Sequence, residues 1–377
     1  DRHGYGMTAR FTLDNGRGIG VVGLPHPYPT RTGPTWSYLI ECQGRTLIDA
    51  GPIGALPTLE IGLKSLGHKL KHINNLIITH GHQDHDGNAY DLLKASGAEL
   101  WAHELYFSFI SLGQPNRLLD TSSPLHRVLK KARGEEENWY RKNYAKSDHS
   151  KWMNYYKRYM GDRKKILDER LPANYIHDLD EIDDLTFLHT PGHAIDEICI
   201  ASDGAIFTGD HVLPQISPHP THKQPYPDQI LDTMPSQYLD SIKYYGLAPY
   251  LRSLGKVLAL DNHTTLFPAH RLFSNNRFHL RNIRRAQDIV RHHSKRLQQI
   301  RSSIEGGANT IQSIARAVFP ARKLTGGAFF GALSEVVSHL ELLQDVGDIV
   351  VEEDYSIKTK EPTTFLNAIS EITNYQL

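Results

Sequence analysis

The sequence predicts an α/β fold, and two observations carry that prediction. Short apolar runs bounded by turn residues recur along the chain, for example at 76–79 and 185–189. Between such runs lie segments in which apolar residues repeat every three or four positions, as the leucines of 56–66 do. Strands that alternate with helices along a chain are typical of an α/β domain.

The first 103 residues contain hairpin patterns and then strands alternating with helices. We expect strands at 19–24, 36–42, 46–49, 76–79 and 99–102, and helices at 56–66 and 87–95. Strand patterns return at 185–189, 198–202, 205–208 and 265–267. Residues 1–103 and 185–275 are therefore expected to form one core.

Residues 104–184 interrupt this alternation with a long basic and aromatic segment. Between Arg127 and Lys165 there are thirteen Lys or Arg against five Asp or Glu. The aromatic residues include Trp139, Tyr140, Tyr144, Trp152, Tyr155, Tyr156 and Tyr159. We expect a helical insertion over the sheet, either a lid that holds an anionic group or a solvated helical pair whose rings pack on the sheet.

The remaining part, 276–377, is expected to form a C-terminal helical domain. The apolar residues of 311–318 share one helical face, with Asn309 or Thr310 as the N-cap. A second helix is expected at 333–343 and a short strand at 349–351. Two helices and a small β-wing resemble a winged-helix module. The tail from about Lys358 is polar and only weakly periodic.

The most informative motif is His80-Gly81-His82-Gln83-Asp84-His85, which directly follows the strand expected at 76–79. Alternate side chains of a strand share one face, so His80 and His82 can point the same way. Imidazole and carboxylate together suit zinc, and also iron or manganese. Packing does not account for three imidazoles at the end of a buried strand, so the sequence predicts a metal site here.

Four more motifs place a His or Asp at the end of an expected strand, beside Gly or Pro. They are Asp49-Ala50-Gly51, Pro191-Gly192-His193, Gly209-Asp210-His211 and Pro268-Ala269-His270. Loops at strand ends are where α/β proteins build their sites. Each motif is weak alone, but the set in this order is specific.

On these motifs the chain resembles the metallo-β-lactamase-fold hydrolase superfamily, and within it the glyoxalase II-like branch with a bridging aspartate. The resemblance covers 19–103 and 185–275 and implies an αββα sandwich with the metals at one edge. It assigns His80, His82 and His193 to one metal, Asp84, His85 and His270 to the second, and Asp210 to both. Asp84 and Asp210 would be the catalytic carboxylates, and Asp49 would support a ligand from behind. One departure is Pro-Ala-His at 268–270, where Pro-Gly-His is common.

The resemblance implies a hydrolase with two divalent metal ions, zinc first, with iron or manganese as alternatives. A metal-bound hydroxide would attack a thioester, ester or lactone, such as an acyl-CoA or a glutathione thioester. Asp210 in the bridging position argues against β-lactam hydrolysis. The substrate is expected to be a small anionic molecule, and His211 and His219 are candidates for contacting it.

Two other functions remain open. The C-terminal unit is similar to that of lactamase-like endoribonucleases, which makes metal-dependent RNA cleavage the first. Against it, the helix expected at 333–343 would carry Glu335 and Glu341 on its outside, and this charge disfavours phosphate contacts. The second open function is that of an iron oxidoreductase of the persulfide dioxygenase type.

Composition narrows the class of protein further. The formal net charge is zero, so no overall field points to nucleic acid or membrane, and no apolar run reaches the roughly twenty residues that cross a bilayer. Cys42 and Cys199 lie in strand-like runs and are expected to be buried hydrophobes. The first residues do not have a signal-peptide pattern, although a removed leader stays open. We expect a cytoplasmic protein without a membrane partner, either monomeric or a homodimer.

Overall fold

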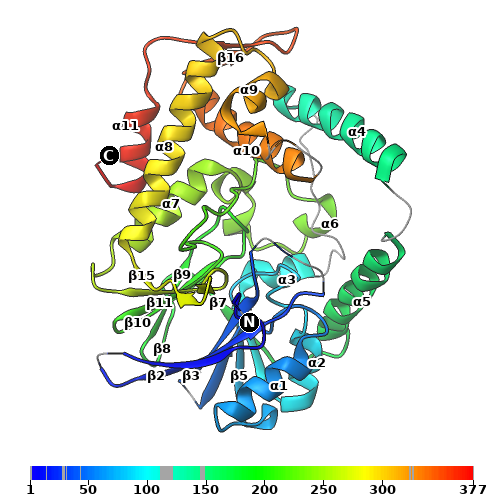
Figure 1. The fold of residues 1–377 in the computed structure, drawn as a ribbon, viewed down its shortest axis with the longest axis vertical. Helices are drawn as coiled ribbons and strands as arrows, with labels where there is room; N and C mark the ends of the chain where they lie inside the picture. The colour runs from blue at the N-terminus through cyan, green and yellow to red at the C-terminus, as the bar shows by residue number, and fades with distance from the viewer. Residues whose placement is uncertain are drawn as a thin grey trace.

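The computed structural model contains two β-sheets packed face to face, with helices on both outer sides (Figure 1). It describes residues 2–376 except 14, 28–29, 31, 43, 111–121, 145–148, 322–323 and 325–326, and it describes 135–144, 149–153 and 327 by their backbone alone. The predicted α/β fold with an αββα sandwich is confirmed.

The first sheet has seven strands in sequence order. They are β1 (Thr8–Thr12), β2 (Gly18–Leu24), β3 (Thr35–Glu41), β4 (Arg45–Ile48), β5 (Asn75–Ile78), β6 (Glu99–His103) and β7 (Ala173–Ile176). Strands β1 to β4 pair antiparallel, and β4 to β7 pair parallel. Parallel pairing of β4 with β5 brings the ends of both strands to one edge of the sheet, where Asp49 and the first histidine motif follow.

The second sheet has six strands in the order β15-β12-β11-β10-β9-β8. Their bounds are β8 (Glu181–Ile182), β9 (Leu185–His189), β10 (Ile198–Ser202), β11 (Ala205–Gly209), β12 (Thr265–Pro268) and β15 (Arg281–Asn282). Strands β11 and β12 pair parallel, and their neighbours in this sheet pair antiparallel. Asp210 and His270 follow these two parallel strands, so both residues leave the same edge.

Alternation along each strand decides which layer a side chain joins. In β3, Tyr38 and Ile40 face the second sheet, whereas Leu39 faces the outer helices. In β10, Ile200 lies between the sheets and Cys199 faces the other helix layer. Both cysteines are buried and free, as predicted.

Helices cover both outer faces of the sandwich. Helices α1 (Leu56–Ser65), α2 (Ala89–Ser96) and α5 (His149–Asp168) pack on the first sheet. Helices α7 (Leu247–Leu258) and α8 (Arg284–Glu305) pack on the second. Short elements complete the order: η1 (Leu70–His72), α6 (Asp228–Leu231), η2 (Ser236–Tyr238), η3 (Ser241–Lys243), β13 (Phe273–Ser274) and β14 (Arg277–Phe278).

The insertion is shorter than the predicted 104–184. Strands β7 and β8 belong to the two sheets, so only α3 (Glu104–Ile110), α4 (Pro124–Tyr144) and α5 lie outside them in the described part of this segment. The sequence did not reveal β7 because it is an edge strand: its Tyr175 is 56% exposed, and Ile176 is its one buried residue. An edge strand needs few apolar residues, so the pattern that marks a buried strand is missing.

The C-terminal part packs on the second sheet through a large apolar cluster. Helices α9 (Ile311–Val318) and α10 (Gly327–Asp345) precede the hairpin β16 (Ile349–Val351) and β17 (Ile357–Thr359). Of the two predicted N-caps, Asn309 and Thr310, it is Thr310 that caps α9, because its side chain accepts a hydrogen bond from the backbone N–H of Ser313. The order helix, helix, hairpin is the predicted one, and its assignment as a winged helix stays a prediction.

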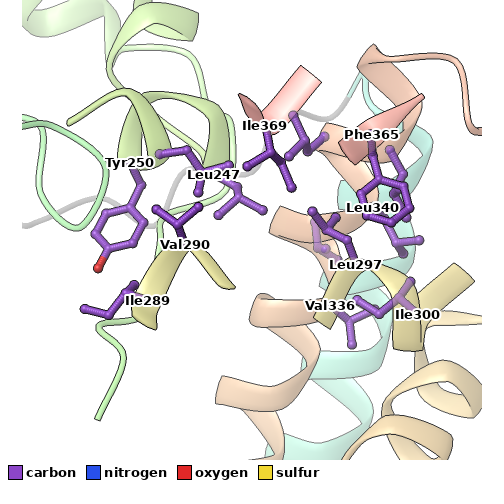
Figure 2. Close-up of a cluster of buried hydrophobic side chains, with 14 of the residues drawn as sticks. Leu247, Tyr250, Ile289, Val290, Leu297, Ile300, Val336, Leu340, Phe365 and Ile369 are labelled. Atoms are coloured by element: carbon purple, nitrogen blue, oxygen red, sulfur yellow. The ribbon is translucent and has the colours of Figure 1, made fainter. Parts of the chain in front are cut away.

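The tail forms more structure than its polar sequence indicates. Helix α11 (Phe365–Thr373) buries Phe365 and Ile369 in the cluster shared by α7, α8 and α10 (Figure 2). Helix α10 also lies inside this cluster, through Val336 and Leu340 (Figure 2). Among the described residues, no helix combines the length and apolar character that spanning a membrane requires.

Candidate metal centre

The candidate site begins where β5 ends. His80 is fully buried and His82 half-buried, and Nε2 of His80 lies 2.9 Å from Nδ1 of His82. His193, in the turn after β9, completes a group whose ligand atoms lie within 4.8 Å of one another. The structure thus brings together the first predicted triad from two distant parts of the chain.

The other predicted residues converge beside that triad. Nε2 of His270 lies 3.2 Å from Oδ2 of Asp84 and 3.4 Å from Oδ1 of Asp210. Nε2 of His85 lies 3.7 Å from the same Asp210 oxygen and 3.9 Å from Oδ1 of Asp84. Donor atoms around a tetrahedral zinc ion, with bonds of about 2.0–2.1 Å, are about 3.3 Å apart. The measured pairs, at 3.2–3.9 Å, are close to that spacing.

Asp210 lies between the two groups. Its Oδ1 faces His85 and His270, while its Oδ2 lies 3.6 Å from Nε2 of His193. One carboxylate oxygen therefore faces each group, as a bridging role requires.

His26 was not predicted and joins the second group. The ligand atoms of His26, Asp84 and His270 lie within 4.8 Å of one another, and a third compact group consists of His80, His85 and Asp210. Burial lowers the pKa of His26 to about 4, so its ring is neutral near pH 7. His26 follows the end of β2 in Leu24-Pro25-His26-Pro27, the same strand-end pattern as the other motifs, and this signal could have revealed it.

Asp49, predicted to support a ligand from behind, contacts His85. Its Oδ2 accepts a hydrogen bond from Nδ1 of His85 at 2.8 Å, and its Oδ1 accepts one from the backbone N–H of Thr79 at 2.8 Å. Asp49 has a positive φ of 61°, which turns its carboxylate back toward the end of β5. A carboxylate behind an imidazole fixes the proton on Nδ1 and leaves the lone pair of Nε2 for a metal.

Backbone carbonyls perform the same role for two other rings. Nδ1 of His193 donates to the carbonyl oxygen of His219 at 3.1 Å, and Nδ1 of His270 donates to that of Pro34 at 3.1 Å. A carbonyl can only accept, so each ring carries its proton on Nδ1. The Nε2 atoms therefore point into the site, and burial lowers the pKa of His193, whereas Asp210 and Asp84 raise that of His270 against the effect of burial.

The centre contains buried polar atoms that have no hydrogen-bond partner in the described part of the chain. They include Nε2 of His85, Nε2 of His193 and Oδ1 of Asp210. An unsatisfied buried polar atom costs about 1–3 kcal/mol, so several at one place need an explanation. Imidazole nitrogens and carboxylate oxygens aimed at a common point fit a divalent cation.

Protonation of the histidines differs across the centre. Burial lowers the pKa of His82 to about 3 and that of His80 well below its usual value. Burial also opposes the charge on His85, but Asp49 and Asp84 outweigh it and raise the pKa of this ring to about 10. His85 is therefore protonated without a metal, and a cation that binds it must displace that proton.

Glu197 is a second residue that the sequence did not indicate. Its side chain is fully buried, and Oε1 accepts a hydrogen bond from the backbone N–H of Asp210 at 2.8 Å and lies 3.8 Å from Nδ1 of His80. Burial, with Asp210 nearby, raises its pKa well above the usual range. Glu197 holds the backbone of Asp210 in place and contacts the back of His80.

The two predicted substrate contacts lie in different environments. His211 is fully buried beside Tyr250, with ring centroids 5.0 Å apart, and does not line the cavity. His219 does line the cavity, and its carbonyl supports His193.

A cavity of about 1150 Å³ opens beside the centre. His82, Asp84 and His193 form one part of its wall, and Arg133 of α4 and Phe330 of α10 form another. Helix α5 adds Tyr156, Tyr159 and Arg163. The side chains of Trp139, Tyr140, Tyr144 and Trp152 lie outside the described residues.

Helix α10 is a wall of the site rather than an exposed surface helix. Glu341, expected on its outside, is buried and accepts hydrogen bonds from Nε2 of His126 at 2.6 Å and from the backbone N–H of Lys223 at 2.9 Å. The expectation was wrong because α4 packs over this face of α10.

Comparison with known proteins agrees with this geometry. The family model described as "Metallo-beta-lactamase superfamily" matches residues 30–270. The "Probable metallo-hydrolase YqjP" of Bacillus subtilis (strain 168) is 24% identical over 334 residues, which cover 86% of this chain and 92% of that protein.

Two solved structures are similar over nearly their whole length. The metallo-beta-lactamase family protein TTHA1429 from Thermus thermophilus is 20% identical, with a TM-score of 0.58, over 91% of this chain and 98% of that one. A beta-lactamase domain protein from Burkholderia ambifaria is also 20% identical, with a TM-score of 0.61, over 94% and 95% of the two chains. The predicted metallo-β-lactamase-fold hydrolase is confirmed, while the glyoxalase II-like branch stays a prediction. Since the family match spans more than half of the chain, the protein belongs to the metallo-β-lactamase superfamily.

Proposed function

We propose that the protein is a hydrolase that holds two divalent cations, zinc in the first instance, between its two groups of His and Asp. The observation that carries this proposal is the position of Asp210, whose two oxygens face different groups, one toward His193 and the other toward His85 and His270. A carboxylate placed between two sets of imidazoles suits a pair of neighbouring cations.

Two cations bound there would lower the pKa of a shared water molecule and polarise the electrophile. The protein's own residues orient the side chains that would bind the cations. Three imidazole rings are each held by a hydrogen bond from their Nδ1: His85 by Asp49, His270 by the carbonyl of Pro34, and His193 by the carbonyl of His219. Their Nε2 atoms therefore need no rearrangement when a cation arrives. Glu197 fixes the backbone of the carboxylate between the two groups.

The cavity supports a substrate of substantial size that bears an anionic group. Its volume of about 1150 Å³ is slightly larger than the roughly 300–1,000 Å³ of typical small-molecule sites. Arg133 provides positive charge at the wall formed by α4, and Tyr156 and Phe330 provide aromatic surface. We therefore propose a thioester, ester or lactone substrate, with an acyl-CoA or a glutathione thioester as the first compounds to test. The name of the Bacillus subtilis relative supports hydrolysis in general.

Endoribonuclease activity and persulfide dioxygenase activity are the two alternatives, and the experiment described below distinguishes them from thioester hydrolysis. Helix α10 is the counterpart of the helix expected to contact nucleic acid, and its packing against α4, α7, α8 and α9 disfavours that role. The persulfide dioxygenase type would require iron, which metal analysis distinguishes from zinc.

The experiment measures metal content and then hydrolysis of acyl-CoA, acyl-glutathione and a labelled RNA by the zinc-loaded protein. We expect about two metal ions per chain and thioester hydrolysis that stops with chelator and in Asp210→Asn. The matched control is Asp203→Asn, in the exposed turn after β10. Full turnover in Asp210→Asn would refute the proposal, and RNA cleavage or oxygen consumption would assign one of the alternatives.

A further inference from the structure

We propose that helix α10 acts, through His219, as a positioning element for His193, so that the C-terminal helices are part of the metal centre. This inference rests on the proposed two-metal function. It assigns His219 the role of a positioning residue rather than only a substrate contact.

The first step is the contact between His219 and His193. The carbonyl oxygen of His219 accepts the hydrogen bond from Nδ1 of His193 at 3.1 Å, and it thereby sets both the tautomer and the direction of that ring. The Nε2 atom of His193 is buried without a hydrogen-bond partner among the described residues and lies 3.6 Å from Asp210. A shift of the His219 backbone would therefore move a ligand atom.

The second step is the attachment of His219 to α10. Its Nε2 lies 2.9 Å from the carbonyl oxygen of Gly331, and its Nδ1 lies 2.6 Å from that of Pro220. The Ser338 hydroxyl, further along α10, donates to the Ser334 carbonyl of its own helix at 3.0 Å and lies 3.4 Å from the Pro220 carbonyl. The segment 219–220 is thus bonded to α10 through the His219 ring and contacts it at Ser338.

The third step is the closing of the loop around the His193 turn. The backbone N–H of Thr221 donates to the carbonyl of Gly192 at 2.7 Å, and the Thr221 hydroxyl donates to the same oxygen at 3.0 Å. Together with the bond from His193 to His219, these contacts hold 192–193 from one side. The series of contacts that positions His193 therefore runs from α10 to the loop 219–221, and from that loop to the turn 192–193.

Helix α7 holds the other side of the same turn. Gly192 has a φ of 137°, and a Cβ atom there would lie 2.4 Å from the Cα of Tyr250. Ser253 donates to the carbonyl of Pro191 at 2.8 Å. Helices α7 and α10 are fixed relative to each other, because Leu247 and Val336 belong to one apolar cluster, part of which Figure 2 shows.

The second group of ligands is held by different parts of the chain. Pro34 supports His270 and Asp49 supports His85, and both lie in the first sheet or its loops. A change in the contact between His219 and α10 should therefore weaken metal binding at the His193 group and leave the other group nearly intact. A general loss of stability would affect both.

The test compares His219→Ala and His219→Leu, which lack a donor, with His219→Gln, whose amide nitrogen replaces the Nε2 donor. Each full-length protein is loaded with zinc and titrated with a chelator, and bound metal is counted at each step. We expect two binding phases in the wild type. In the Ala and Leu variants the metal affinity of the phase from the His193 group should fall about tenfold or more, where tenfold is the lower end of what losing a supporting contact costs. The metal affinity of the other phase should stay within about twofold of the wild-type value. The Gln variant should behave as the wild type.

The outcomes separate this inference from the proposed function. A wild type that binds no metal refutes the proposed function, and with it this role of His219. A wild type that binds two ions, with Ala and Leu variants that retain both phases, refutes the positioning role alone. Equal weakening of both phases, or no recovery in His219→Gln, also refutes it. The Leu variant fills the volume of the ring, so a folding defect in the Ala variant does not prevent the comparison.

Discussion

Arg163 and Asp86 form an ion pair in the interior, where the inserted helix α5 meets the loop of the first histidine motif. Nε of Arg163 lies 3.4 Å from Oδ2 of Asp86, and both side chains are nearly inaccessible to solvent. Tyr159 donates to the other carboxylate oxygen at 2.8 Å. The guanidinium also lies 3.4 Å from the carbonyl of Gly81, between two of the proposed ligands. A buried ion pair therefore joins the inserted helix α5 to the loop of the first histidine motif.

Arg163→Met should destabilise the fold by about 3–5 kcal/mol, because it leaves Asp86 buried without its cation. The matched control is Arg158→Met on the same helix, whose ion pair with Asp91 is largely exposed and is worth less than about 1 kcal/mol. Urea unfolding of the metal-free proteins measures both changes. Equal effects of the two substitutions would contradict the prediction. The double variant Arg163→Met with Asp86→Asn should recover part of the loss.

Removal of metal should lower the melting temperature, because a cation that binds only the folded state stabilises it. At a free metal concentration of about one hundred times Kd, each site contributes about 2.7 kcal/mol. Calorimetry before and after dialysis against chelator, with metal content confirmed, measures the change. Addition of zinc should restore the original value. Identical melting of the loaded and stripped proteins would exclude a resident metal.

Asp49→Asn should weaken metal binding about 10- to 100-fold, in line with the loss of a supporting carboxylate. The amide can still contact Thr79, but it no longer provides the negative charge that holds the proton on Nδ1 of His85. Chelator titration should show the larger change in the phase that does not depend on His219. A variant with wild-type affinity would remove Asp49 from the description of the site.

The stability of the fold should fall as pH decreases from about 6.5 toward 4. Burial lowers the pKa values of His189 and His339 to about 4, below the value of about 6.5 expected in an unfolded chain. In this range the unfolded chain binds protons that the folded protein does not, so each group costs up to about 1.4 kcal/mol per pH unit. Above a pH of about 6.5 neither group contributes a slope.

His339→Gln should make the stability of the fold less dependent on pH, and the reduction should equal the contribution of one histidine. The control is His263→Gln, at an exposed position before β12, which should leave the slope unchanged. Urea midpoints measured on metal-free protein from neutral pH down to about 4.5 provide the comparison. A slope that is the same in both variants would show that His339 takes up a proton inside the fold.

The sequence predicted most of the strands that carry the proposed ligands, because buried strands require continuous apolar runs. It also predicted that the strand-end motifs meet, since parallel strands such as β4 and β5 or β11 and β12 end at one edge. Strand β7 was missed because an edge strand can be half-exposed.

Burial of polar residues was the harder part to predict. Glu197 and Glu341 read as ordinary charged residues in the sequence, yet both are buried because distant segments provide their partners: Asp210 for the first, and His126 and Lys223 for the second. His26 was overlooked because the prolines around it indicated a plain loop. The contacts of Glu197 and Glu341 with distant segments leave no local pattern, so only the fold reveals their burial.

The proposed ligands come from two separate stretches of chain, with the insertion between them: 80–85 on one side, and His193, Asp210 and His270 on the other. A nascent chain that ends before His193 offers a cation only the side chains of 80–85. The group that Asp210 joins to His85 and the group that contains His193 are therefore complete only when both stretches have been synthesised and have folded onto each other.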